Sequence, residues 1–170
     1  MKKIFLLLAV VGMTLTQSCE GDPGPQGPTG YSAEAEVFEI RNVNFVNDGS
    51  GFYGIVYGLN PSILASDMIL VYRQSGSFNG NPIWESLPKT YYFSNGEELD
   101  VNFDFTMNDI SIYLDYTDPS VLTADFVQNQ LFRVVIVPGY LSNKMSSTKY
   151  DDVKKELNID ESDFAKSIRK

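Results

Sequence analysis

Few residues of this chain have side chains suited to catalysis. Its 170 residues include 22 acids but no histidine, so a Ser-His-Asp triad, a Cys-His pair and histidine-ligated metal sites are excluded. Ser146 and Lys149 match a Ser-x-x-Lys pattern, yet the companion motifs of penicillin-binding enzymes are missing. Two carboxylates at a set separation suffice for glycoside hydrolysis, so a carboxylate-based hydrolase stays an alternative. We otherwise expect no enzymatic activity and no catalytic residues.

Aromatic residues are the main candidates for ligand binding. Trp84, Tyr72, Tyr91 and Tyr92 could together form an aromatic platform for a sugar. A structural role is the main expectation, because a single tryptophan on a short strand of a β-sandwich usually belongs to the core or caps it. A carbohydrate-binding module is therefore an alternative function.

Four aspartates crowd one segment and its exit: Asp104, Asp109, Asp115 and Asp118. Carboxylate and backbone carbonyl oxygens are suitable ligands for calcium, but no loop has EF-hand spacing. We expect no metal and no other cofactor, and these four residues are the calcium candidates if a sugar-binding site is calcium-assisted.

The only cysteine, Cys19, follows a leader with the layout of a secretory signal. Lys2 and Lys3 precede an apolar stretch at 4–13, which is too short to span a bilayer. A cysteine at the end of such a leader predicts a lipoprotein signal peptide over residues 1–18, with Cys19 as the lipidated first residue of the mature chain. The usual motif has Leu three residues before the cysteine, whereas Thr16 stands there. The alternative is ordinary cleavage that leaves a free thiol or removes Cys19.

Residues 19–33 contain glycine at every third position from Gly21 to Gly30, which is the period of collagen. Three or four triplets are too few to hold a triple helix, so we expect an extended spacer rather than a trimerising stalk. At about 3.1 Å per residue, the spacer would hold the following domain roughly 35 Å from the lipid.

The charge of the chain limits its partners. The net charge is −9, and removal of Lys2 and Lys3 with the signal peptide lowers it by two, to −11. Phosphate backbones and anionic headgroups repel such a chain, so we expect no nucleic acid and a membrane link through the acyl chains on Cys19.

Residues 34–145 have the pattern of an all-β domain, an antiparallel β-sandwich of seven to nine strands. The alternation of apolar residues changes phase at Arg41 and Asn42, which predicts a bulge. Residues 74–81 read as a loop, and 98–116 as a hairpin with one acidic face containing Asp100, Asn102 and Asp104. The expected core includes Phe103, Phe105, Ile112, Leu114, Val135 and Val137.

Two features stand apart from the strand pattern. Arg133 interrupts an apolar strand, for which an edge position or a salt bridge to a neighbouring acid is the main expectation and a ligand contact is the alternative. Residues 146–170 carry apolar residues at helical spacing and predict short helices: Tyr150, Val153 and Leu157, then Phe164 and Ile168.

Four motifs together carry a resemblance to a known group: residues 18–25 (Ser-Cys-Glu-Gly-Asp-Pro-Gly-Pro), Val71-Tyr72, 84–88 (Trp-Glu-Ser-Leu-Pro) and 132–138 (Phe-Arg-Val-Val-Ile-Val-Pro). With these motifs, most of the mature chain resembles short collagen-like lipoproteins of Bacteroidota that have a β-rich domain of unknown function. The resemblance implies an envelope location and β architecture, and it implies no activity or functional residue. Glu20 and Asp22 lie where acidic surface-export signals occur in such lipoproteins.

These observations predict a cell-envelope lipoprotein, anchored in the outer membrane and facing the periplasm or the cell surface. Its domain would be a non-enzymatic binding or structural module on a spacer, with an envelope protein or a glycan as partner.

Overall fold

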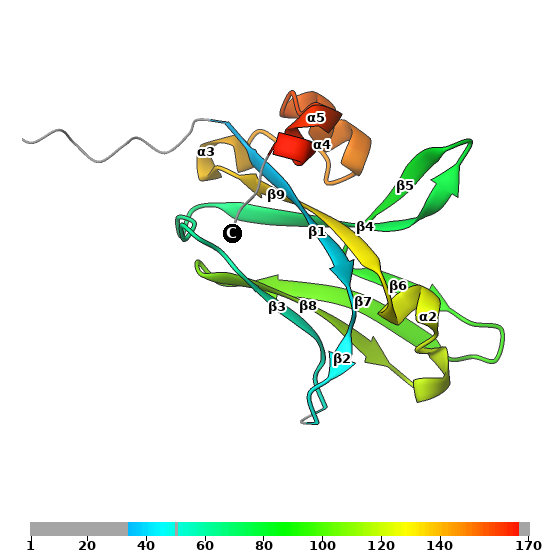
Figure 1. Cartoon of the computed structure of the whole chain (residues 1–170). Helices are drawn as coiled ribbons and strands as arrows, with labels where there is room; N and C mark the ends of the chain where they lie inside the picture. The colour runs from blue at the N-terminus through cyan, green and yellow to red at the C-terminus, as the bar shows by residue number, and fades with distance from the viewer. Residues whose placement is uncertain (1–33, 50, 167–170) are drawn as a thin grey trace, which may run out of the picture. The chain divides into compact units, whose positions relative to one another are not determined.

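The computed structural model of the protein describes residues 34–49 and 51–166 (Figure 1). The leader, Cys19 and the glycine-rich segment lie outside the described residues. Residues 32–170 group into one compact unit, so the C-terminal helices belong to the same unit as the strands.

Within the described ranges, nine antiparallel strands form two sheets, which confirms the predicted all-β sandwich. The first sheet has the order β1 (Glu36–Val43), β9 (Gln130–Val137), β4 (Met68–Phe78), β5 (Asn81–Ser86). The second sheet has the order β2 (Val46–Asn47), β3 (Tyr53–Gly58), β8 (Asp109–Tyr116), β7 (Glu98–Phe105), β6 (Lys89–Tyr92). The predicted bulge is confirmed, since the β1–β9 register shifts between Ile40 and Val43 and Asn42 has a φ of 54°.

The predicted loop at 74–81 is wrong, because β4 continues through it and turns directly into β5. The β4–β5 register shifts between Gln74 and Gly76, and this irregularity breaks the alternation that would have indicated a strand. Asn79 and Gly80 both have positive φ, 49° and 79°, as a tight two-residue hairpin turn requires. Figure 1 shows the resulting β4–β5 hairpin extending away from the other strands.

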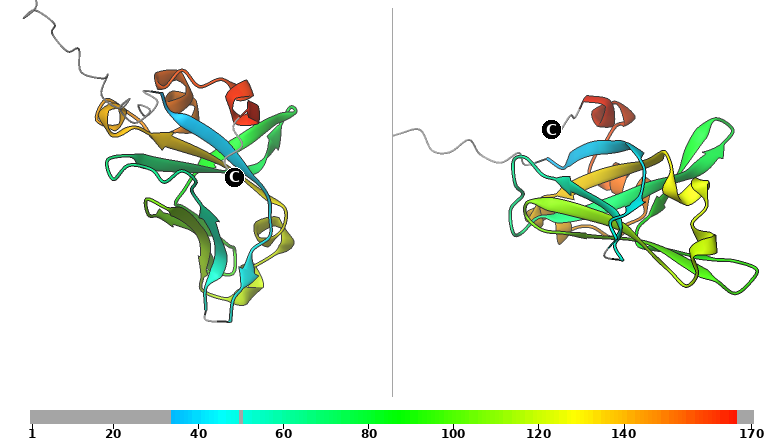
Figure 2. Two further views of the ribbon diagram at one scale, coloured as in Figure 1. Left: turned by 60° about the vertical axis from the view of Figure 1, so that its left-hand side comes forward. Right: turned by 60° about the horizontal axis from the view of Figure 1, so that its bottom comes forward.

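Helices cover the outer face of the first sheet. The predicted C-terminal helices are confirmed as α4 (Tyr150–Glu156) and α5 (Glu161–Lys166). Both views of Figure 2 place them on the side of the first sheet that faces away from the second. In the part of the chain that the structure describes, three single-turn helices interrupt connections where only turns were expected: η1 (Pro119–Val121), α2 (Ala124–Val127) and α3 (Gly139–Ser142). No helix among the described residues is long and apolar enough to span a bilayer.

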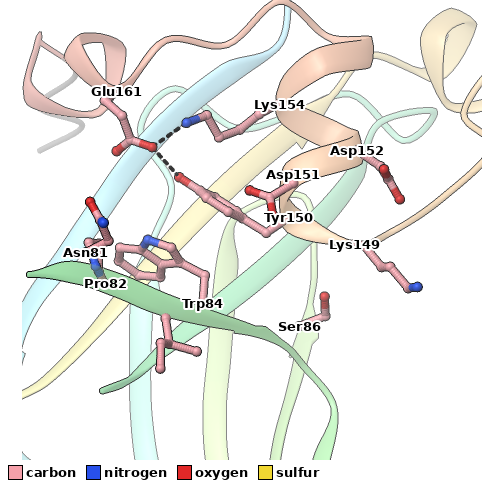
Figure 3. Close-up of a pocket in the computed structure, with 11 residues that line it drawn as sticks. Asn81, Pro82, Trp84, Ser86, Lys149, Tyr150, Asp151, Asp152, Lys154 and Glu161 are labelled. Carbon is pink, nitrogen blue, oxygen red and sulfur yellow. Dashed lines mark hydrogen bonds and ion pairs between the residues drawn. The ribbon is translucent and has the colours of Figure 1, made fainter. Parts of the chain in front are cut away.

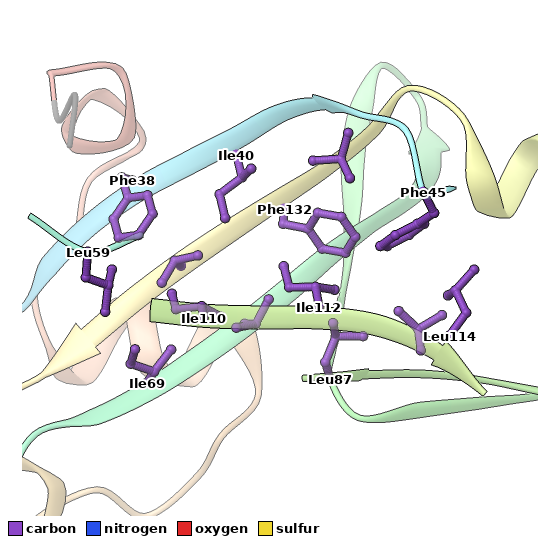
Figure 4. Packing of buried hydrophobic residues seen from close by; sticks show 14 of the residues in the cluster. Phe38, Ile40, Phe45, Leu59, Ile69, Leu87, Ile110, Ile112, Leu114 and Phe132 are labelled. Atoms are coloured by element: carbon purple, nitrogen blue, oxygen red, sulfur yellow. The ribbon is translucent and has the colours of Figure 1, made fainter. Parts of the chain in front are cut away.

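The hydrophobic core has two layers. The main layer lies between the sheets and includes Phe38, Ile112, Leu114 and Phe132 (Figure 4). A second layer lies between the first sheet and α4 and α5, and its members include Val135 and Val137. Strand β9 is therefore buried on both faces, which explains its almost continuous apolar sequence.

Two residues that were predicted to be core residues are less buried than expected. Phe103 is only half-buried, and Phe105 is 39% exposed. Phe105 is the last residue of β7 and pairs with Ile110 at the end of the β7–β8 hairpin, whereas the buried residues Leu99 and Val101 lie earlier on the strand. On the opposite face of β7, Asp104 is exposed as predicted, whereas Asp100 and Asn102 are half-buried. These two pack against Thr90 and Asp115, with which they form hydrogen bonds.

Candidate functional site

An open hollow of about 740 Å³ lies between β5 and the C-terminal helices. Figure 3 shows its walls: Asn81, Trp84 and Ser86 project from β5, and facing them lie Lys149, Tyr150, Lys154 and Glu161. Aromatic, amide and charged groups therefore meet around one concave surface. This composition suits a polar ligand with apolar faces.

Arg133 contacts several of the side chains that surround this hollow. Its guanidinium carbon lies 4.1 Å from the Trp84 ring centroid and 4.2 Å from that of Phe164. Its nitrogens contact carboxylate oxygens of Glu39 at 2.9 Å and Glu161 at 2.6 Å. Strand β9 lies between β1 and β4, so Arg133 is not at an edge, and the predicted salt bridge to a neighbouring acid is confirmed. Burial alone would lower the pKa of Arg133, but the hydrogen bond with Glu39 and the charges around it raise that pKa overall.

Glu161 and Tyr150 connect this cation to the helices. The Tyr150 hydroxyl accepts a hydrogen bond from Arg133 and donates one to Glu161 at 3.2 Å. Lys154 also pairs with Glu161. Burial acts to raise the pKa of Glu161, yet hydrogen bonds from Lys154 and Arg133 hold that pKa below its usual range. Glu161 therefore stays ionised near neutral pH, which makes it unsuited to act as a general acid.

Trp84 is the more exposed of the two aromatic residues that line the hollow, the other being Tyr150. Its indole is half-buried and tilted against Tyr150, with ring centroids 5.6 Å apart. Its Nε1 is buried and has no hydrogen-bond partner among the described residues. A buried donor without an acceptor is uncommon in folded proteins. Trp84 therefore contributes an indole N–H that no acceptor among the described residues satisfies.

The structure does not bring the four aromatic candidates together. Tyr72 is completely buried, and its hydroxyl donates to the Thr148 carbonyl at 3.0 Å. Tyr91 packs on Phe126 in the core between the sheets, on the other side of the first sheet from Trp84. Tyr92 is 76% exposed on β6. Trp84 alone of the four lines the hollow.

The four calcium candidates also lie apart, in local hydrogen bonds. Asp109 accepts from Thr106, and Asp115 from Asn102. Asp118 caps η1, where the hydroxyl and backbone N–H of Ser120 hold the pKa of this exposed aspartate below its usual range. Asp104 is exposed on β7. Within the described ranges, no three His, Cys, Asp or Glu side chains are grouped closely enough to hold a metal ion.

The residues that build the hollow were mostly missed by sequence reasoning. Arg133 was recognisable as a charge inside an apolar strand, but no local signal pointed to Glu39 or Glu161, which lie far from it in the chain. Comparisons with protein-family models, with curated proteins and with solved structures found no match to this chain.

Proposed function

We propose that this chain is a lipid-anchored cell-envelope protein whose β-sandwich is a non-enzymatic binding or structural module. The order of its segments carries the proposal: an apolar leader ends at Cys19, glycine-rich triplets follow, and the compact unit begins at Ser32. In this arrangement the acyl chains hold the protein at the outer membrane, and the triplets act as a spacer.

Changing Cys19 to Ala should abolish membrane attachment. The thiol is the only group in the chain that can receive the thioether-linked lipid, and two or three acyl chains suffice for stable anchoring. In cells fed labelled palmitate, the unchanged protein should incorporate label and sediment with membranes, whereas Cys19→Ala should do neither. A Thr16→Leu variant, which restores the usual motif, serves as the processed control. Label on the Cys19→Ala protein would refute the anchor.

Within this proposal, the hollow at Trp84 is the best-supported binding site. Aromatic surface, the Asn81 amide and several charged side chains converge there. This favours a domain that binds a glycan over a domain with a purely structural role. A carboxylate-based hydrolase is less well supported, because the carboxylate of Glu161 is held between Arg133 and Lys154.

Replacing Trp84 by Ala should weaken glycan binding at least about tenfold, equivalent to about 1.4 kcal/mol. The measurement is a glycan-array screen of the full chain, with and without calcium, followed by titration of the best ligand. Tyr92→Ala is the matched control, because it removes an aromatic ring that is 76% exposed and lies outside the hollow. Equal loss in both variants, or none in Trp84→Ala, would argue against this site.

A further inference from the structure

A second open hollow, of about 670 Å³, lies on the other side of the first sheet, where β4 and β5 meet β6 and α2. Its lining includes Arg73, Glu85, Tyr91, Phe126, Gln128 and Gln130. It shares no lining residue with the hollow at Trp84, so a ligand in the second hollow is independent of the function proposed for the first.

Arg73 is buried and hydrogen-bonded at the base of this second hollow. It is 5% exposed, and its Nε donates to Gln130 Oε1 at 2.8 Å. Its two terminal nitrogens donate to the Tyr91 hydroxyl at 3.1 Å and to the Asp125 carbonyl at 2.8 Å. The guanidinium carbon lies 5.0 Å from the Phe126 ring centroid. Such packing fixes the orientation of the planar cation before any ligand arrives.

The charge of Arg73 has no direct counterion among the residues described. The other buried arginine, Arg133, contacts two carboxylates, whereas all three acceptors of Arg73 are neutral. The nearest acid by strand pairing is Glu85, opposite Arg73 on β5. Glu85 instead accepts from the Tyr91 hydroxyl and pairs with Lys89 at 3.9 Å. A buried cation is costly unless it is paired.

The guanidinium also has donors to spare. An arginine side chain carries five N–H groups, and the three hydrogen bonds of Arg73 use three of them. The two that remain belong to the terminal nitrogens, since Nε has only one hydrogen. Paired N–H groups of this kind match the geometry of a carboxylate.

We propose that this second hollow binds a sugar acid, with the sugar's carboxylate on Arg73. The planar cation recognises the carboxylate, and the amide side chains of Gln74, Gln128 and Asn129 at the rim provide both donors and acceptors for ring hydroxyls. The site is open, so it admits the end or a side branch of an acidic polysaccharide.

Calorimetric titration of the full chain with galacturonate tests this assignment. Galactose, which has the same ring but no carboxylate, should give no saturable heat. Arg73→Met should weaken galacturonate binding at least about tenfold, as expected for the loss of a charge-assisted contact. Gln130→Glu is a second variant, which places a carboxylate beside Nε and should weaken binding similarly by supplying an internal counterion. Tyr92→Ala should bind like the unchanged chain.

Several results would overturn the proposal. Absence of saturable galacturonate binding to the unchanged chain would do so without any variant, as would equal binding of galactose. Unchanged affinity in folded Arg73→Met or Gln130→Glu protein, verified by thermal melting, would separate the ligand from Arg73. Tighter binding of N-acetyl-alanyl-alanine than of galacturonate would reassign the site to a peptide carboxylate and refute the sugar acid.

Discussion

Replacing Glu39 by Gln should lower the free energy of unfolding by about 3 kcal/mol, within the range found when one partner of a buried ion pair is removed. The side chains of Glu39 and Arg133 are 5% and 8% exposed, and 2.9 Å separates the paired atoms. The variant keeps the shape of the side chain but replaces the buried carboxylate at Nε by a neutral amide, which leaves the half-exposed Glu161 as the carboxylate that still contacts Arg133. Because Arg133 also contacts Glu161 and the rings of Trp84 and Phe164, the C-terminal helices should loosen in the same variant.

Urea denaturation monitored by far-UV circular dichroism measures this effect. Arg41→Gln is the matched control, because Arg41 pairs with the same Glu39 but its own side chain is 62% exposed. Loss of the Arg41–Glu39 pair should change the free energy of unfolding by less than about 1 kcal/mol. Replacing Glu39 and Arg133 together by Leu should restore much of the stability, since a buried pair is often replaceable by apolar residues. Equal effects of Glu39→Gln and Arg41→Gln would refute a central role for the buried pair.

Phe132→Ala should destabilise the domain by about 3 to 5 kcal/mol, the usual range for truncating a buried phenylalanine. Phe132 is completely buried in the main core layer on the central strand β9, with its ring centroid 6.0 Å from that of Phe45. Neighbours on a central strand cannot easily collapse into the space that the ring leaves.

Phe78→Ala is the corresponding control, because it makes the same substitution at a residue that is 70% exposed near the end of β4. We expect its thermal midpoint to stay close to that of the unchanged chain, whereas Phe132→Ala should melt far lower in the same calorimetric scan. A Phe78→Ala effect as large as that of Phe132→Ala would mean that the hairpin end is packed in solution.

The fold class could be predicted from the sequence because alternation at period two is a local property. The β7–β8 hairpin, the bulge at Asn42 and the helices α4 and α5 each follow from neighbouring residues. The turn at Asn79 and Gly80 had a local signal too, since Asn-Gly is typical of two-residue hairpins. The glycine and serine residues around this turn are typical of loops, and for this reason a loop was predicted instead of two strands.

The candidate sites could not be predicted in this way, because they join residues from distant strands. Trp84 and Arg133 meet only because β5 and β9 both pair with β4. The spacing of residues in the sequence does not indicate which strands pair. Alternation also gave the face of Phe105 but not its burial, because alternation does not tell which other side chains pack over a residue at the end of a strand. The same limit applied to Arg73, whose neutral hydrogen-bond acceptors include the Gln130 side chain and the Asp125 carbonyl of the one-turn helix α2.

The pairing of β1 with β9 has a consequence for when the domain can fold. These are the first and last strands of the described residues, and they lie side by side in the first sheet, with Val43 opposite Gln130. Local hairpins such as β7–β8 can form as soon as they are synthesised, but β1 has no sheet neighbour until β9 exists. Pairing over such a separation slows folding. The first sheet therefore cannot take in β1 until β9 has been synthesised, so completion of this sheet is expected to be a late step in folding.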